Sequence, residues 1–188
     1  ATTIDDAAGE AFDKAAKLLG LPYPGGPAIE ALAAGGDATA GPLPRPLVGS
    51  GEPHFSFAGL KSAVQRAAAS GNYKPEDIAA SFQQAVVDCL IDRTRLALER
   101  SDAPALVVAG GVAANRAVRN ALQQLAEHEG RKFSVPPGWL CTDNAAMIAW
   151  AGAERFALGL TDPLDAPARA RWPLDEGAEK VRGAGVKA

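Results

Sequence analysis

Cysteine and histidine are scarce in this chain, which has two of each among its 188 residues. Cys89 and Cys141 are too few for a disulfide framework and too far apart for a redox Cys-x-x-Cys pair. His54 and His128 are also far apart and lack the spacing of metal ligands, so these residues encode no complete metal site. With this cysteine usage, we expect a protein of the reducing cytoplasm.

Long apolar runs and a positive net charge are absent as well. No uninterrupted apolar run approaches the roughly 20 residues that a transmembrane helix needs, so we expect no membrane partner. The chain has 19 basic and 22 acidic residues, a net charge of −3, which excludes a basic body that grips nucleic acid non-specifically. The sequence also contains no P-loop, no Gly-x-Ser-x-Gly elbow and no His-Glu-x-x-His motif.

Apolar periodicity predicts a mostly helical chain with a few short strands. The expected helices cover residues 6–19, 27–34, 60–69, 75–100, 115–127 and 142–158. Short strands are expected at 55–57, 105–109 and 133–135, the last two buried and parallel. The order strand, glycine turn, helix, strand, helix predicts an α/β fold.

Three single residues in these helices have an expected structural role. Asp77 and Thr142 are placed to cap the helices that they begin. Cys89 belongs to the apolar stripe of its helix and is expected to be a small core side chain rather than a nucleophile.

A glycine-rich turn at residues 110–115 separates the first buried strand from the next helix. Gly110 and Gly111 leave the backbone bare, and free N–H groups there suit phosphate or ribose oxygens. Asn115 could bond a ligand's hydroxyl groups, or it could simply be the N-cap of the helix. Arg116 and Arg119 follow and fit either a phosphate contact or an ordinary surface.

Two groups of acidic residues allow similar alternatives. Asp143 follows Thr142 at a helix start, where the helix dipole alone favours a carboxylate, but it could also ligate a metal at the mouth of an α/β crevice. Asp6, Glu10, Asp13 and Lys17 recur along one helix and are typical of a solvated face. The bare loop Tyr23-Pro-Gly-Gly-Pro27, which comes directly after this helix, would instead allow a ligand to approach it closely.

Six motifs occur in one order along the chain and together are highly specific. They are Asp5-Asp-Ala-Ala-Gly-Glu-Ala-Phe-Asp-Lys14, Tyr23-Pro-Gly-Gly-Pro27, Phe55-Ser-Phe-Ala-Gly-Leu-Lys61, Gly110-Gly-Val-Ala-Ala-Asn-Arg116, Cys141-Thr-Asp-Asn144 and Arg171-Trp-Pro173. From Thr3 to about Asp175 the chain resembles the bacterial tRNA threonylcarbamoyladenosine transferases (TsaD), long called Gcp or O-sialoglycoprotein endopeptidases.

The resemblance implies a helix-rich lobe of the actin/Hsp70/hexokinase-like (ASKHA) fold and a transferase activity. The family moves a threonylcarbamoyl group from threonylcarbamoyl-adenylate to the tRNA adenosine 3′ of the anticodon. By position, Asp13, Gly26 and Asn115 match the family's substrate-binding residues, and Glu30 stands where many members have a substrate-binding Asp. Asp143 matches the carboxylate ligand of one divalent metal, iron or zinc.

The family's His-x-x-x-His metal motif and its Ser-Gly-Gly loop are absent from this sequence. We therefore expect a C-terminal portion of the transferase, residues 1–175, followed by a flexible tail at 176–188, with the N-terminal half absent and no activity alone. No general base is evident among these residues.

The resemblance further implies tRNA and TsaB- and TsaE-type subunits of the modification complex as partners. Two alternatives remain open on the sequence: a non-catalytic scaffold or dimerisation partner of that complex, and the metallo-glycoprotease that the older name implies.

Overall fold

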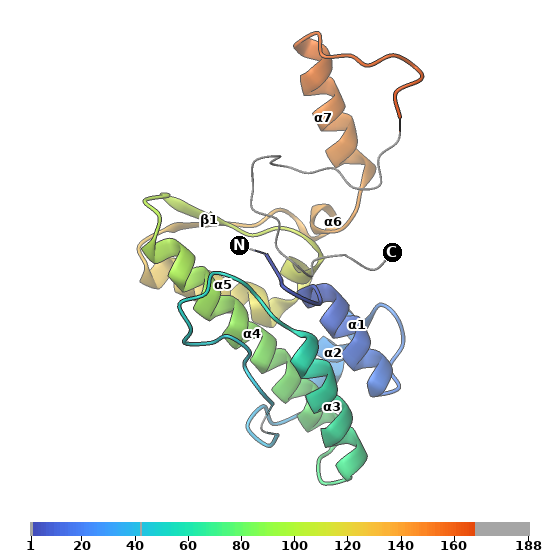
Figure 1. Cartoon of the computed structure of the whole chain (residues 1–188), viewed down its shortest axis with the longest axis vertical. Helices are drawn as coiled ribbons and strands as arrows, with labels where there is room; N and C mark the ends of the chain where they lie inside the picture. Colours follow the sequence, from blue (N-terminus) through green and yellow to red (C-terminus); the bar gives the residue numbers. More distant parts are fainter. Residues whose placement is uncertain (1, 42, 168–188) are drawn as a thin grey trace.

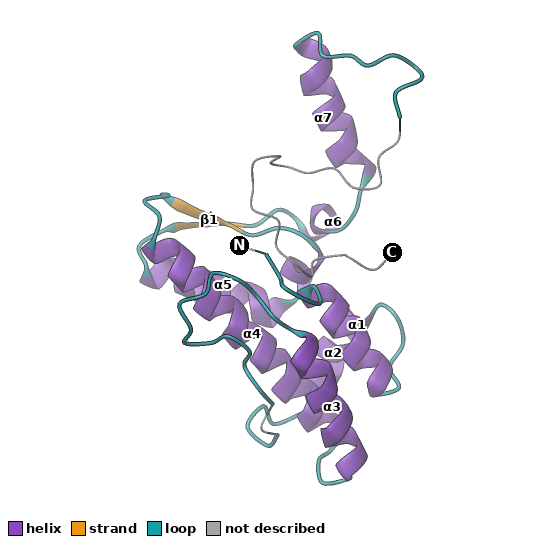
Figure 2. Cartoon of the chain, in the orientation of Figure 1, coloured by secondary structure: helices purple, strands orange, loops and turns teal. Residues whose placement is uncertain are grey.

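The structure is a computed structural model that describes residues 2–41 and 43–167. The motif at 171–173 and the expected tail at 176–188 lie outside these residues. The helices and strands of the described residues, in chain order, are α1 (Ala8–Leu18), α2 (Gly25–Ala33), α3 (Ala58–Ser70), α4 (Pro75–Glu99), β1 (Ala105–Val107), the 3₁₀-helix η1 (Gly111–Ala114), α5 (Arg116–His128), β2 (Lys132–Ser134), α6 (Gly138–Cys141) and α7 (Ala145–Ala157). The predicted helix-rich α/β character is confirmed (Figure 2).

The long helix α4 packs against α1, α2, α3 and α5 (Figure 1). It contacts α2 and α3 at one end and α5 further along. Phe82 of α4 meets Phe12 of α1 edge to face, with ring centroids 5.2 Å apart, in the middle of the α1–α4 core. The predicted apolar stripe of this helix is buried at Ile78, Phe82, Ala85 and Cys89. Burial, the largest cause, raises the pKa of the Cys89 thiol to about 11, so this cysteine is an inert core side chain.

A strand–helix–strand unit packs on the other half of α4. β1 and β2 pair in parallel, with Leu106 opposite Phe133, and α5 connects them. Leu106 and Phe133 pack with Val118 and Leu122 of α5. Val107, however, is 68% exposed, so the expectation of a fully buried strand is wrong. In the described part of the chain, the pair of strands has no helix on that outer face.

Helix α7 stands apart from the other helices (Figure 1), and none of its residues is buried. Its cap is Asn144, whose Oδ1 accepts a hydrogen bond from the Met147 N–H at 3.1 Å. The expectation that Thr142 caps this helix is wrong, because the helix begins two residues later than predicted, after Asn144. No helix in the described segments has both the length and the apolarity needed to cross a bilayer.

Three other local expectations are wrong. Helix α2 begins at Gly25 rather than Pro27, because α1 supplies a carboxylate to its first N–H. Asp77 does not cap α4: its Oδ1 accepts from the Asp37 N–H at 2.9 Å instead. Residues 55–57 form one isolated bridge, Thr3 to Phe55, rather than a strand, since the N–H groups of Phe57 and Ala58 donate to the Asp5 carboxylate instead.

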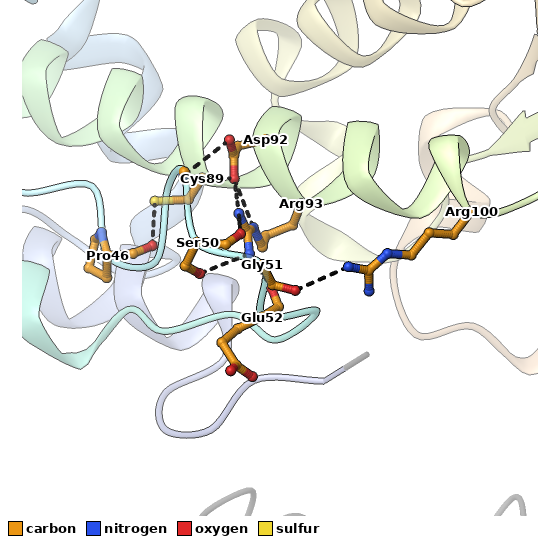
Figure 3. Close-up of polar contacts among 9 residues, drawn as sticks. Pro46, Ser50, Gly51, Glu52, Cys89, Asp92, Arg93 and Arg100 are labelled. Atoms are coloured by element: carbon orange, nitrogen blue, oxygen red, sulfur yellow. Dashed lines mark hydrogen bonds and ion pairs between the residues drawn. The ribbon is translucent and has the colours of Figure 1, made fainter.

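The connection between α2 and α3 is held against α4 (Figure 3). The guanidinium of Arg93, whose side chain is only 3% exposed, donates to the Ser50 carbonyl at 2.8 Å, and also to the Glu52 carbonyl and the carboxylate of Asp92. Arg100 donates to the Gly51 carbonyl at 3.2 Å. A proline- and glycine-rich segment is thereby fixed in one path.

Candidate functional site

A cavity of about 360 Å³ opens between α1, α2 and the turn that precedes α5. Its polar lining consists of Asp13, Glu30, Asn115 and Thr142, and its apolar lining includes Phe12, Tyr23, Pro24, Pro27, Val112 and Ala114. The four residues predicted to bind substrate, Asp13, Gly26, Glu30 and Asn115, all line this one cavity although they span about a hundred positions of sequence. The fold therefore brings them together.

Asp13 joins α1 to the start of α2. Its Oδ1 accepts a hydrogen bond from the Gly25 N–H at 2.8 Å, which satisfies one of the free N–H groups at a helix start. A Cβ at Gly25 would lie 2.6 Å from the Asp13 Cα, so only glycine fits at this crossing. The acidic residues in and just before α1 thus have two roles. Asp13 lines the cavity, whereas Asp6 and Glu10 pair with Lys14 at 2.7 Å each.

Gly26 differs from its neighbour Gly25. A Cβ built on Gly26 would meet no protein atom within 4 Å, so packing does not require a glycine there. Because Gly26 lines the cavity, the space beside its Cα is space that a ligand can use. Tyr23 also lines this cavity, and it is 85% exposed, so its aromatic ring is accessible to a ligand.

Asn115 is 6% exposed and has a clear structural role. Its Oδ1 accepts from the Val118 N–H at 3.1 Å, which makes it the N-cap of α5, and its Nδ2 donates to Gln83 Oε1 of α4 at 2.9 Å. The capping alternative is therefore confirmed. An amide has two N–H donors and a second lone pair on oxygen, so these two bonds leave capacity for a ligand.

Glu30 makes the contact between α2 and the start of α5. Its Oε1 accepts from the backbone N–H of Arg116 and from Arg116 Nε, both at 3.0 Å. The Glu30 side chain is 21% exposed and the Arg116 side chain 83% exposed, so the pair lies at the edge of the cavity.

Asp143 is exposed and does not line the cavity, although its neighbour Thr142 does. Among the residues that the structure describes, no three His, Cys, Asp or Glu side chains come together as a metal site would require. One exposed carboxylate does not hold iron or zinc, so the residues present do not by themselves fit the implied metal.

Sequence reasoning missed the contacts that support the site. Gly25, Gln83 and Arg116 each contact a predicted residue from an element far away in the chain. Two of the sequence motifs also meet directly, because Asp5 accepts hydrogen bonds from the Phe57 N–H at 2.7 Å and the Ala58 N–H at 3.2 Å. No spacing within either motif reveals such a contact.

The fold is an α/β unit whose cavity offers carboxylates, bare glycine backbone and an amide beside an apolar wall, a lining that is typical of small-molecule sites. Residues 1–150 match the TsaD family, described as tRNA N6-adenosine threonylcarbamoyltransferase. The chain belongs to this family, and its fold is the helix-rich α/β lobe of an ASKHA-type protein.

Several curated relatives named tRNA N6-adenosine threonylcarbamoyltransferase are similar to the chain. It is 75% identical to that of Sphingopyxis alaskensis, 70% to that of Novosphingobium aromaticivorans and 67% to that of Erythrobacter litoralis. All of this chain aligns with each of them, but it covers only 55%, 54% and 55% of their respective lengths. The chain thus spans about half the length of these relatives.

Proposed function

We propose that this chain forms the adenosine-binding part of a tRNA N6-adenosine threonylcarbamoyltransferase, which uses threonylcarbamoyl-adenylate and tRNA as substrates. The observation that carries the proposal is the convergence of Asp13, Gly26, Glu30 and Asn115 on one cavity. The names of its relatives support the same activity and support neither a scaffold nor a glycoprotease.

The chemistry of the cavity suits a nucleoside better than a phosphate. Asp13 and Glu30 are both carboxylates, which repel phosphate oxygens but accept hydrogen bonds from ribose hydroxyls. The apolar wall around Phe12, Val112 and Ala114 can cover a base. The phosphate and threonylcarbamoyl groups would then point out of this cavity.

In the proposed reaction, the N6 amine of the tRNA adenosine attacks the carbamoyl carbonyl carbon. A carbon–nitrogen bond forms, the bond from that carbon to the phosphate oxygen breaks, the amine loses a proton, and AMP leaves. Asp13, Gly26 and Asn115 contribute by holding the adenylate in place, so their effect is positioning.

We further propose that Asp143 supplies one ligand to an iron or zinc ion whose other ligands lie outside this chain. TsaB- and TsaE-type subunits and a cytoplasmic location belong to the same proposal. None of the roles assigned to the residues of the cavity depends on the metal.

Transfer of threonylcarbamoyl to tRNA, measured on a polypeptide of the relatives' full length that carries this chain, tests the function. We expect activity in that protein, and neither activity nor stoichiometric iron or zinc in the 188-residue chain alone, because one carboxylate does not hold the ion. Absence of transfer in the full-length protein would contradict the proposal.

The adjacent glycines provide a matched pair of variants for the site. We expect Gly26→Ala to keep the melting temperature and raise the KM for threonylcarbamoyl-adenylate at least tenfold, because its Cβ enters only the ligand's space. Gly25→Ala should instead lower the melting temperature, because its Cβ collides with α1. An unchanged KM in Gly26→Ala would show that the adenylate binds elsewhere.

A further inference from the structure

Glu30 and Arg116 connect the two sides of the cavity at its edge. We propose that this ion pair, the Glu30–Arg116 bridge, is a positioning device that sets the distance between α2 and the start of α5 and thereby the fit of the adenosine. The proposal rests on the proposed function, because it concerns the same cavity.

The hydrogen bonds place the bridge between the two binding segments. Glu30 lies one helical turn after Gly26 on α2, and Arg116 directly follows Asn115. One carboxylate oxygen accepts both the backbone N–H and the side-chain Nε of Arg116, at 3.0 Å each. A shift of α2 away from α5 would therefore lengthen two bonds at once and move Gly26 relative to Asn115.

The carboxylate of Glu30 also completes the cap of α5. The first turn of this helix contains no acidic residue of its own. Asn115 satisfies the Val118 N–H, and Glu30 reaches from another helix to satisfy the Arg116 N–H. A negative charge at this position is favoured by the dipole of α5, so the start of the helix itself holds the Glu30 carboxylate in place.

Because Arg116 is exposed, the effect of the Glu30–Arg116 bridge on the cavity can be separated from an effect on the stability of the fold. Arg116 is 83% exposed, and ion pairs of this kind contribute little to the free energy of unfolding. The core that holds α2 lies elsewhere, at Ile29 and Ala33, which are buried. Loss of the bridge should therefore loosen the cavity while the fold is kept.

A double-mutant cycle in the full-length polypeptide tests the bridge, with Glu30→Gln, Arg116→Met and the combination. The probe is AMP, and its Kd is measured by calorimetry together with the KM for threonylcarbamoyl-adenylate, the kcat and the melting temperature. We expect each single variant to raise the Kd and the KM about three- to fivefold, and the double variant to be no worse than either single one. The melting temperature should stay unchanged in Arg116→Met and fall only slightly in Glu30→Gln, whose amide oxygen can still accept the Arg116 N–H.

Asp88→Asn is the matched control. Asp88 pairs with Arg45 at 2.9 Å, is also partly exposed, and lies on α4 away from the cavity lining. We expect this variant to leave the Kd for AMP unchanged. An unchanged Kd in Glu30→Gln, additive effects in the double variant, or an equal effect of Asp88→Asn would each overturn the proposed bridge. Absence of transfer by the unsubstituted protein, in contrast, would contradict the proposed function while the coupling in AMP binding still reports on the bridge.

Discussion

Asp5 is a residue whose single carboxylate joins two segments about fifty positions apart. Burial opposes its ionisation, but hydrogen bonds from the Ser56 hydroxyl and from the N–H groups of Phe57 and Ala58 outweigh that effect and hold the pKa of Asp5 below its ordinary value of 3.8. These N–H groups lie at the start of α3, where a helix has free donors. Asp5 therefore caps α3 from a distance and fixes the N-terminal segment beside it.

We expect Asp5→Asn to lower the free energy of unfolding by about 1–2 kcal/mol near neutral pH, since it loses a charged cap. A pKa that is lower in the folded state gives stability that is fully present above the unfolded pKa of about 3.9 and is lost as the pH falls through the folded value. The difference between wild type and variant should thus be constant from about pH 5 to 8 and shrink at lower pH.

Urea unfolding of the chain at a series of pH values measures this difference. Asp102→Asn, at an exposed position between α4 and β1, is the control and should leave the free energy of unfolding unchanged. A difference that persists undiminished at pH 3 would mean that the charge of Asp5 does not contribute.

Individual residues of the candidate site could be predicted unequally well. Asp13, Gly26 and Asn115 were identifiable because each lies in a motif that is contiguous in the sequence, and Glu30 because it stands where many family members have an Asp. The contacts that Gly25, Gln83 and Arg116 make were not, because they form between α1 and α2, α4 and α5, and α2 and α5. Those contacts are set by packing, which leaves no mark on local spacing.

At the scale of elements, the connection between α2 and α3 is more firmly held than its composition predicts. Its prolines and glycines are typical of a loose linker, but Arg93 holds Ser50 and Glu52, and Arg45 pairs with Asp88. The anchoring residues lie about forty positions away on α4. The helices themselves were predictable, because their apolar stripes are local patterns, whereas the path of this connection depends on partners elsewhere in the chain.

We expect Arg93→Ala to lower the free energy of unfolding by about 2–3 kcal/mol, because it removes a buried guanidinium and leaves two partly buried carbonyl groups and the Asp92 carboxylate without their charged partner. Chemical denaturation measures the loss, and thermolysin, which cuts before apolar residues, should then cut the freed segment before Val48, which is already 42% exposed. Arg95→Ala, an exposed position on the same helix, serves as the control and should change neither result. Equal stability of the two variants would show that the connection needs no anchor.

Over the whole molecule, two hydrophobic clusters share α4. One cluster unites α1, α2, α3 and α4, and the other unites α4, α5 and the strands. Val112 packs against both clusters and lines the cavity, so the cavity lies where the two clusters meet. The relative position of its walls consequently depends on α4 and on the few polar contacts that cross from one cluster to the other.

Helix α7 has consequences for how backbone hydrogens exchange with solvent. It has 13 residues and buries none of them, and a helix of that length without a buried face is marginal in water. In deuterated buffer, the amides of α7 in the 188-residue chain should exchange within about tenfold of unstructured rates, while those of α4 remain protected for far longer. Equal protection of α7 and α4, measured by mass spectrometry, would contradict this expectation. We therefore expect one end of this molecule to open and close independently, and its centre to unfold only as a unit.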